Sequence, residues 1–299
     1  MTDEIRTVSV IGTGRMGAAM ASRIAGAGFR TVVWNRTTEK AAAVARDVGC
    51  EIADSAAEAC ASADVVVCSL ADDAALVEAH TGPGGILEGI RAGAVVVETS
   101  TVDPETITSV AGHYLEAGAS LLDAPVSGSV SLVEQGALTS MAGGDAAALS
   151  KARPVIETYS KTVFHLGRNG TGATMKLAVN SLVHATNLAI AEALVLAEKA
   201  GVDREKTYEV FASSAASSPF LQYKRQAFER PGEVPVAFSL DLVNKDLELI
   251  LDLARRVGAP MEQLDATAEL TRRAVSAGMG ADDMSALAVL LRESGHTPP

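Results

Sequence analysis

The pair of residues best suited to chemistry in this sequence is a lysine and an asparagine four positions apart. Lys176 and Asn180 follow a glycine-containing segment at residues 170–172, and residues at i and i+4 of a helix project from the same face. Their neighbours are apolar, and a lysine in such a setting loses hydration, which lowers its pKa toward neutrality. It could then exchange a proton with a carbonyl or hydroxyl oxygen while the carboxamide holds the substrate. Taken alone, the lysine could equally reach solvent from a helix start.

A glycine-rich turn near the N-terminus indicates a dinucleotide site. Residues 7–11 are rich in β-formers, and a Gly-x-Gly-x-x-Gly sequence then leads into a small-residue helix expected over 18–27. Gly12 permits the tight turn, Gly14 lets the backbone approach a pyrophosphate, and Gly17 lets the helix pack on the strand. Backbone N–H groups at the helix N-terminus would supply the anion site. The cofactor-binding residues predicted here are Gly12, Thr13, Gly14, Arg15, Met16 and Gly17.

The end of the second predicted strand, residues 31–34, bears on which cofactor binds. NAD sites usually carry Asp or Glu at this point, whereas this chain has Asn35, Arg36 and Thr37. Arg36 can pair with a 2′-phosphate and stack on adenine, and its two neighbours add hydrogen-bond donors. We therefore predict that NADPH is preferred and that NADH use is possible. The alternative is that Arg36 is an ordinary surface charge.

Two fully apolar strands, residues 64–70 and 94–98, indicate a parallel sheet covered on both faces. Ligand-facing loops lie at the carboxyl ends of such strands, which nominates Leu70 and Thr101 as cofactor-binding residues. Asp103, followed by proline, is expected to cap a helix. The segment 123–129 could cup a carboxylate or be a β-turn.

From residue 171 onward the pattern is almost entirely helical. Residues 173–200 predict one helix of about 40 Å, in which charged residues argue against a membrane span and His184 is expected to be a packed core residue. A helix this apolar needs neighbours, so a homodimer or homotetramer is expected. The predicted fold is an α/β Rossmann-type, doubly wound N-terminal domain (residues 1–167) followed by an all-α C-terminal domain (168–299), joined by a long interdomain helix.

Composition agrees with an enzyme of two domains. The chain has 299 residues, of which 48% are apolar, enough for two cores. Its net charge of −12 argues against nucleic acid and membranes as partners. No signal peptide is visible, and Cys50, Cys60 and Cys68 have no histidine near them in the sequence. We predict a cytoplasmic protein with reduced cysteines, no metal site and no disulfides.

Taken together, four segments resemble the β-hydroxyacid dehydrogenase family, which includes 3-hydroxyisobutyrate dehydrogenases, tartronate semialdehyde reductases and glyoxylate or succinic semialdehyde reductases. The segments are residues 12–17, 123–128, 170–180 and 244–247, and the resemblance covers essentially the whole chain. It implies an NAD(P)-dependent 3-hydroxyacid dehydrogenase or semialdehyde reductase whose C-terminal domain is similar to that of 6-phosphogluconate dehydrogenase.

The resemblance also implies roles for individual residues. Lys176 would be the catalytic acid/base, and Thr101 and Lys245 would contact the nicotinamide end of the cofactor. The substrate-binding residues predicted in this way are Ser127, Gly128 and Asn180, to which we add the adjacent Ser129 and Asp246. Without the resemblance, Lys245 and Asp246 would pass for a solvated helix face.

Ser129 is a departure from the family pattern, which usually reads Ser-Gly-Gly at this point. The serine adds a side chain and a hydroxyl where the backbone would be bare, and this bears on which substrate binds rather than on the type of reaction. The predicted function is NADPH-dependent hydride transfer to or from a small anionic aldehyde or hydroxy acid. The alternatives are an imine reductase and a non-catalytic NADPH-binding module, and relatives of both kinds are expected to lack the lysine at position 176.

Overall fold

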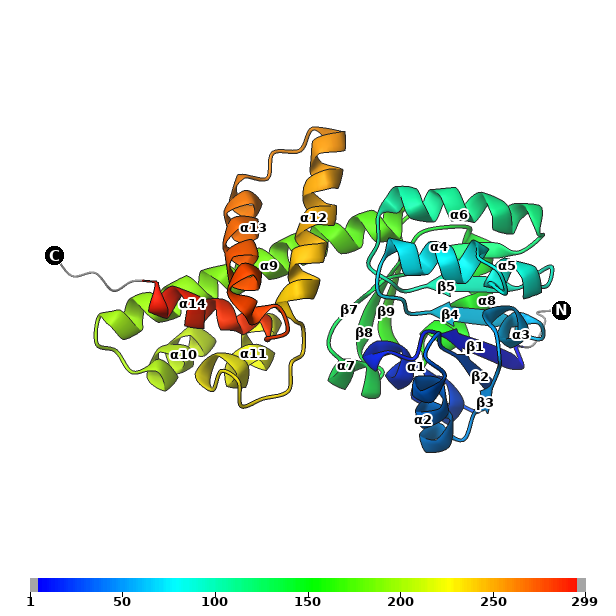
Figure 1. Cartoon of the computed structure of the whole chain (residues 1–299), viewed down its shortest axis with the longest axis horizontal. Helices are drawn as coiled ribbons and strands as arrows, with labels where there is room; N and C mark the ends of the chain where they lie inside the picture. Colours follow the sequence, from blue (N-terminus) through cyan, green and yellow to red (C-terminus); the bar gives the residue numbers. More distant parts are fainter. Residues whose placement is uncertain (1–4, 295–299) are drawn as a thin grey trace. The chain divides into compact units, whose positions relative to one another are not determined.

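The computed structural model describes residues 5–294 and separates into two compact units, Met1–Lys176 and Leu177–Pro299 (Figure 1). This division falls nine residues after the boundary expected at residue 167, since 176 − 167 = 9. The reason is that a helix begins at Thr171 and its first turn is hydrogen-bonded to the first unit.

Unit 1 is built on a six-stranded sheet in the order β3-β2-β1-β4-β5-β6, with every neighbouring pair parallel. The strand order reverses between β1 and β4, which is where ligands bind in sheets of this kind. The doubly wound prediction is confirmed. The strands are β1 (Thr7–Ile11), β2 (Arg30–Trp34), β3 (Glu51–Ile52), β4 (Val65–Cys68), β5 (Val95–Glu98) and β6 (Ser120–Asp123).

Helices cover both faces of this sheet (Figure 1). Successive strand residues point to opposite faces, so Val65 and Val67 belong to one core and Val66 and Cys68 to the other. This explains why the strands are apolar without alternation. The first face carries α1 (Arg15–Gly26), α2 (Thr38–Val48) and α8 (Ala146–Ile156), and the second carries α3 (Ala56–Cys60), α4 (Asp73–Thr81), α5 (Ile86–Gly89) and α6 (Pro104–Glu116).

A second, three-stranded sheet follows in unit 1. Its strands are β7 (Val126–Ser127), β8 (Leu138–Ala142) and β9 (Ser160–His165), and α7 (Val130–Glu134) connects the first two. Strands β7 and β8 are antiparallel, whereas β8 and β9 are parallel. Strand β7 has only two residues, which is too few for the alternation of a strand to show in the sequence.

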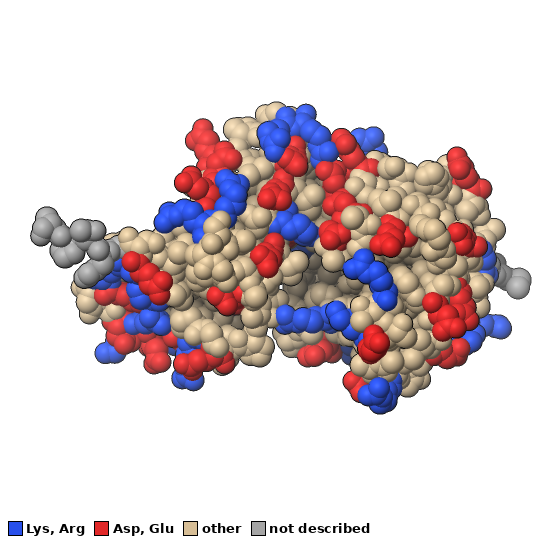
Figure 2. Space-filling model, in the orientation of Figure 1, with Lys and Arg blue, Asp and Glu red and all other residues tan. Residues whose placement is uncertain are grey.

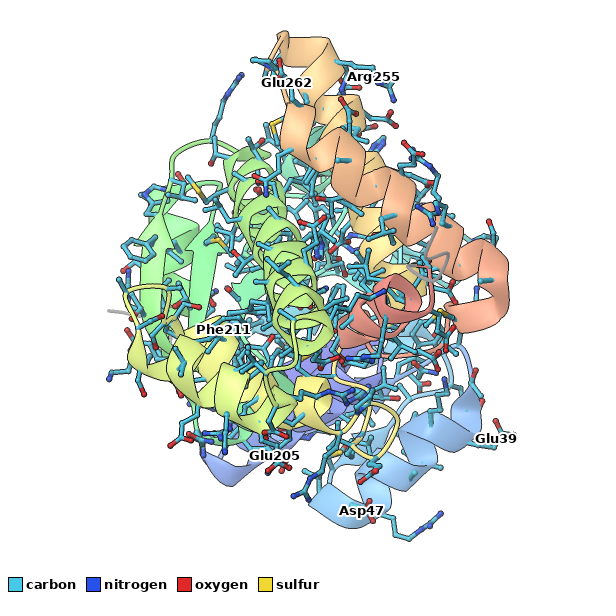
Figure 3. All side chains as sticks on the ribbon, turned by 90° about the vertical axis from the view of Figure 1, so that its left-hand side faces the viewer. Glu39, Asp47, Glu205, Phe211, Arg255 and Glu262 are labelled. Atoms are coloured by element: carbon cyan, nitrogen blue, oxygen red, sulfur yellow. The ribbon has the colours of Figure 1, made fainter. Side chains whose placement is uncertain are left out.

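Unit 2 is all-helical and is organised around α9 (Thr171–Lys199), the single long helix that the sequence predicts. Its length and composition would suit a membrane span, but Leu188 and Leu194 pack in the core of this unit, so it is a core helix. Figure 3 shows α9 flanked by α10 and α11 on one side and by α12 and α13 on the other. The remaining helices are α10 (Arg204–Ser213), α11 (Pro219–Glu229), α12 (Leu240–Val257), α13 (Glu262–Ala274), η1 (Val275–Met279), η2 (Met284–Ala286) and α14 (Leu287–Glu293).

Helix α11 does not follow from the sequence pattern, in which its proline suggests a break. Pro219 instead occupies the start of the helix, where its missing N–H is not needed. Ser218 caps this start by accepting the N–H of Leu221.

Charged side chains of both signs are mixed over the face shown in Figure 2. Arg255 and Glu262 lie at the tip of the α12–α13 hairpin (Figure 3). A positive and a negative side chain are therefore found together there as well. On this face the negative charges are therefore not collected at one point, although the whole chain carries a net charge of −12.

Candidate active site

The glycine-rich turn at the carboxyl end of β1 combines two constrained positions with one open position. Gly12 has a φ of +90°, and a Cβ there would collide with the carbonyl of Ser69. A Cβ on Gly17 would collide with the carbonyl of Gly12. Gly14, at the start of α1, has a φ of −66°, and a Cβ added there would have no described heavy atom within 4 Å beyond its own chain neighbours. The open side of the turn therefore gives access to the N–H groups at the start of α1.

Asn35 braces this turn. Its Oδ1 accepts the N–H of Thr13 at 3.0 Å, and its Nδ2 donates to the carbonyl of Thr37 at 3.0 Å. The Thr13 side chain is buried, and its hydroxyl has no hydrogen-bond partner within residues 5–294. Buried polar groups are normally satisfied, so the Thr13 hydroxyl fits a turn that receives phosphate or ribose oxygens from a dinucleotide.

Arg36 lies just beyond β2 on the surface. Its Nη1 is 3.4 Å from Oε2 of Glu78, and the Arg36 side chain is 77% exposed. Exposed ion pairs of this kind contribute little, so an incoming phosphate can compete with Glu78 for the guanidinium. Arg36 thus lies beyond the end of the second strand with its guanidinium exposed.

A buried hydrogen-bonded network lies behind the two predicted cofactor loops. The Leu70 N–H donates to Oγ of Ser100 at 2.7 Å, and the Ser100 N–H donates to Oε1 of Glu98 at 2.8 Å. The other Glu98 oxygen lies 2.9 Å from Nε2 of His80, whose Nδ1 lies 2.8 Å from the Tyr114 hydroxyl. The network ties the loops after β4 and β5 to α4 and α6. Sequence reasoning missed it because its members come from four separate elements.

Cys68 also lies next to this network, although the sequence shows no histidine near it. One ligand atom from each of Cys68, His80 and Glu98 lies within 4.8 Å of the others. Burial raises the pKa of the Cys68 thiol well above its usual value, which disfavours the thiolate that a metal would need. His80 and Glu98 are already hydrogen-bonded to each other, so the cluster is explained as a structural network.

The segment predicted to hold the substrate spans the end of β7 and the start of α7. Ser127 pairs with Thr139 of β8, and Gly128 follows with a φ of +137°, a conformation that requires glycine. The Ser129 hydroxyl lies 2.7 Å from the Ser131 hydroxyl. The side chain that distinguishes this chain from the family pattern is therefore directed along the loop.

Asp123, at the end of β6, fixes the start of α9. Its carboxylate accepts the N–H of Gly170 at 3.0 Å and the N–H of Ala173 at 2.9 Å. Burial raises the pKa of Asp123, while these N–H donors act in the opposite direction. Gly172 is needed beside it, because a Cβ there would collide with the Asp123 carbonyl. Lys176, which is half-buried, is thus held one turn beyond a fixed point.

Asn180 and Asp246 meet inside unit 2, as do Lys245 and Asp246. Nδ2 of Asn180 donates to Oδ2 of Asp246 at 2.6 Å, and Nζ of Lys245 lies 3.3 Å from Oδ1 of the same carboxylate. Asp246 is only 1% exposed. The segment that looks like a solvated helix face in the sequence therefore places a buried carboxylate between α9 and α12.

Comparison with known families covers both units. Residues 7–167 match the NAD binding domain of 6-phosphogluconate dehydrogenase, and residues 170–291 match the NAD-binding domain of NADP-dependent 3-hydroxyisobutyrate dehydrogenase. The chain belongs to the β-hydroxyacid dehydrogenase family. The two matched domains adjoin near residue 168, at the base of α9.

Individual members of the β-hydroxyacid dehydrogenase family are similar over nearly the whole chain. Glyoxylate/succinic semialdehyde reductase 2, chloroplastic, from Arabidopsis thaliana is 34% identical over 97% of this chain and 81% of its own length. The 2-(hydroxymethyl)glutarate dehydrogenase of Eubacterium barkeri is 30% identical over 94% of this chain and 93% of its own. The structure of 3-hydroxyisobutyrate dehydrogenase from Salmonella typhimurium is 26% identical, with a TM-score of 0.88 over 95% of this chain and 99% of that one.

Family membership confirms the predicted fold and the coarse function. The protein is an oxidoreductase of the 3-hydroxyacid dehydrogenase type with a nicotinamide cofactor. The glycine-rich turn, with its open approach at Gly14 and its unsatisfied Thr13 hydroxyl, fits that cofactor.

Two glycine substitutions separate cofactor binding from folding. Gly14→Ala adds a methyl group where the backbone has room and an ordinary φ, so the unfolding free energy should change by less than about 1 kcal/mol. The methyl group would stand where the pyrophosphate approaches, so we expect the Kd for the cofactor to rise by roughly 10-fold or more. Fluorescence titration and chemical denaturation measure the two effects.

Gly17→Ala is the matched comparison. Its Cβ would collide with the Gly12 carbonyl, so this variant should lose stability as well as binding. An unchanged cofactor Kd in Gly14→Ala would contradict the placement of the pyrophosphate at this turn.

Proposed function

We propose that this protein transfers hydride between NADPH and a small anionic semialdehyde or β-hydroxy acid, with Lys176 as the general acid/base. The observation that carries the proposal is the position of Lys176, one helical turn ahead of Asn180 on a helix whose start is fixed by Asp123. When bound, the nicotinamide supplies or accepts the hydride. All other parts of the reaction fall to side chains of this chain.

Lys176 has the chemistry that the carbonyl oxygen needs. As hydride reaches the carbonyl carbon, negative charge develops on the oxygen, and an ammonium beside it both stabilises that charge and donates a proton. In the oxidative direction the neutral amine removes the hydroxyl proton. The half-buried setting of Lys176 supports this role because water competes less for the ammonium there.

Asn180 would hold the substrate through its carboxamide, with Ser127, Gly128 and Ser129 receiving the substrate carboxylate. Asp246 is too deeply buried to serve as an open substrate ligand, and we infer that it acts through the two groups it contacts, Asn180 and Lys245. This refines the substrate-binding role expected for Asp246 from its position.

The proposed preference for NADPH rests on Arg36. No carboxylate occupies the end of β2, where NAD-binding sites usually have one. The guanidinium there is exposed and lies beside a surface glutamate, so a 2′-phosphate can displace that partner with a bidentate, charge-assisted contact. Thr37 lies beside it, whereas the carboxamide of Asn35 is occupied in bracing the turn.

A substrate panel tests the proposed activity. The purified protein is assayed with both nicotinamide cofactors against short aldehyde acids such as glyoxylate and succinic semialdehyde, the matching hydroxy acids, uncharged aldehydes and cyclic imines. We expect reduction of at least one carboxylated aldehyde, with uncharged analogues slower by roughly 100-fold or more because they lack the anchored carboxylate. Turnover of imines alone would support the imine reductase, and NADPH binding without any turnover would support the non-catalytic module.

We also propose that the protein acts as a homodimer or homotetramer. Leu182 and Leu196 of α9 are 70% and 73% exposed, and large apolar side chains exposed along one helix are typical of a surface covered by another subunit. Light scattering at micromolar concentration should therefore give at least twice the mass of the 30.7 kDa chain; a stable monomer would contradict this. A cytoplasmic location is supported by the three free thiols.

A further inference from the structure

His184 is a buried polar group that the proposed mechanism does not use. It lies on α9 one turn beyond Asn180 and is 2% exposed, and its ring contacts Phe238 with the centroids 5.8 Å apart. Neither ring nitrogen has a hydrogen-bond partner within residues 5–294. Buried polar groups are normally hydrogen-bonded, so a partner for the His184 imidazole should lie close to it.

The Asp246 carboxylate is such a group. Nε2 of His184 lies 3.6 Å from Oδ2 of Asp246, which is the same oxygen that accepts the Asn180 amide at 2.6 Å. A movement of about 0.7 Å would bring the imidazole from 3.6 Å to an ordinary hydrogen-bond distance of about 2.9 Å. His184 and Asn180 thus approach one carboxylate oxygen from neighbouring turns of α9.

We propose that His184 is a positioning residue that holds the Asp246 carboxylate and thereby orients the Asn180 carboxamide for substrate binding. The proposal rests on the proposed role of Asn180 in the active site. In this arrangement the His184 imidazole orients the Asp246 carboxylate, and the carboxylate in turn orients the Asn180 carboxamide.

The reason that orientation matters lies in the asymmetry of a carboxamide. Asp246 can only accept hydrogen bonds when ionised, so it selects the Nδ2 end of Asn180 and fixes the direction of Oδ1 and the second N–H. If the carboxylate rotates, the amide can flip and exchange a donor for an acceptor in front of the substrate. A second donor on the carboxylate, from His184, restricts that rotation.

The kinetic test compares two substitutions at one position. His184→Leu keeps most of the volume but removes the donor, so the KM for the carboxylated substrate should rise by roughly 10-fold. The Kd for NADPH should stay within about twofold, because the glycine-rich turn lies in the other unit. His184→Gln places an amide N–H near the position of Nε2, and it should restore most of the affinity.

Asn187→Leu is the control for a merely structural effect. Asn187 is buried on the same helix and donates to the Met284 carbonyl at 2.8 Å. This variant should lower the melting temperature without raising KM. A KM for His184→Leu within about twofold of the wild-type value, or one that only follows the loss of stability as in Asn187→Leu, would overturn the proposal.

A spectroscopic measurement tests the contact without any substrate. Long-range proton–nitrogen NMR spectra of the imidazole nitrogens, assigned by loss of the signal in His184→Gln, should show the wild-type proton on Nε2. Asp246→Asn should change the nitrogen shifts of His184, because it removes the charge that fixes this tautomer. Unchanged shifts would refute the contact even if the activity is confirmed, whereas changed shifts in a protein that turns over no carboxylated substrate would leave the contact intact and refute the proposed function.

Discussion

Replacement of Lys176 by alanine should lower kcat by on the order of 100-fold or more while NADPH binding survives. In the proposed mechanism the lysine supplies the proton and part of the stabilisation of the developing oxyanion, and both are needed only in the transition state. The cofactor, by contrast, is expected to be held mainly by the glycine-rich turn of unit 1. Steady-state kinetics on the best substrate, together with an NADPH titration, measure the two effects.

Two further variants make the Lys176 result specific. Lys176→Arg keeps the positive charge, but a guanidinium retains its proton at any accessible pH, so this variant should recover little of kcat. Lys199→Ala removes an exposed lysine from the other end of the same helix and should leave kcat unchanged. If Lys176→Ala kept more than about a tenth of the wild-type kcat, the proton would have to come from another group.

Arg36→Asp should weaken NADPH binding by roughly 100-fold and leave NADH use similar or improved. The substitution removes the proposed partner of the 2′-phosphate and puts a like charge in its place. Separate Kd and kcat/KM measurements with both cofactors show the change of preference. A wild-type kcat/KM that is higher with NADH than with NADPH would refute the assignment before any variant is made.

Glu78 provides the control for Arg36. In the structure Glu78 is the carboxylate beside the guanidinium, at 3.4 Å, so Glu78→Gln should leave NADPH binding intact or tighten it by no more than about threefold, as expected for an exposed pair. The small gain should diminish at high salt. A loss of affinity in Glu78→Gln would mean that the ion pair itself shapes the site.

The sequence predicts the parts of this fold that repeat a local pattern. The apolar strands β4 and β5 and the long α9 begin and end within two residues of the expected bounds, because their periodicity is encoded in adjacent residues. Strands β3 and β7 have two residues each, which is too few for any alternation to show. Their existence depends on pairing with strands that lie far away in the sequence.

The candidate site is predictable where a motif carries the chemistry and not where distant side chains meet. Gly12, Gly14 and Gly17 can be assigned from their spacing, and the structure gives each the backbone setting expected of it. The cap that Asp123 provides for α9 and the contact of His184 with Asp246 bridge 50 and 62 positions, from 173 − 123 and 246 − 184. Contacts between residues so far apart in the chain produce no periodic pattern from which a single sequence could predict them.

Because α9 is continuous, new substrate preferences can evolve in this protein without changing the spacing of Lys176 and Asn180. Lys176 and Asn180 are separated by about 6 Å of rise on one continuous helix, so the distance between the proposed proton donor and the proposed substrate-binding amide changes little when other parts of the chain mutate. The segment 127–132, by contrast, is attached by a two-residue strand and tolerates a serine where the family pattern has glycine. With the roles proposed above, selection can change the acid that is recognised through substitutions in this segment, while the spacing of Lys176 and Asn180 on the helix is inherited unchanged.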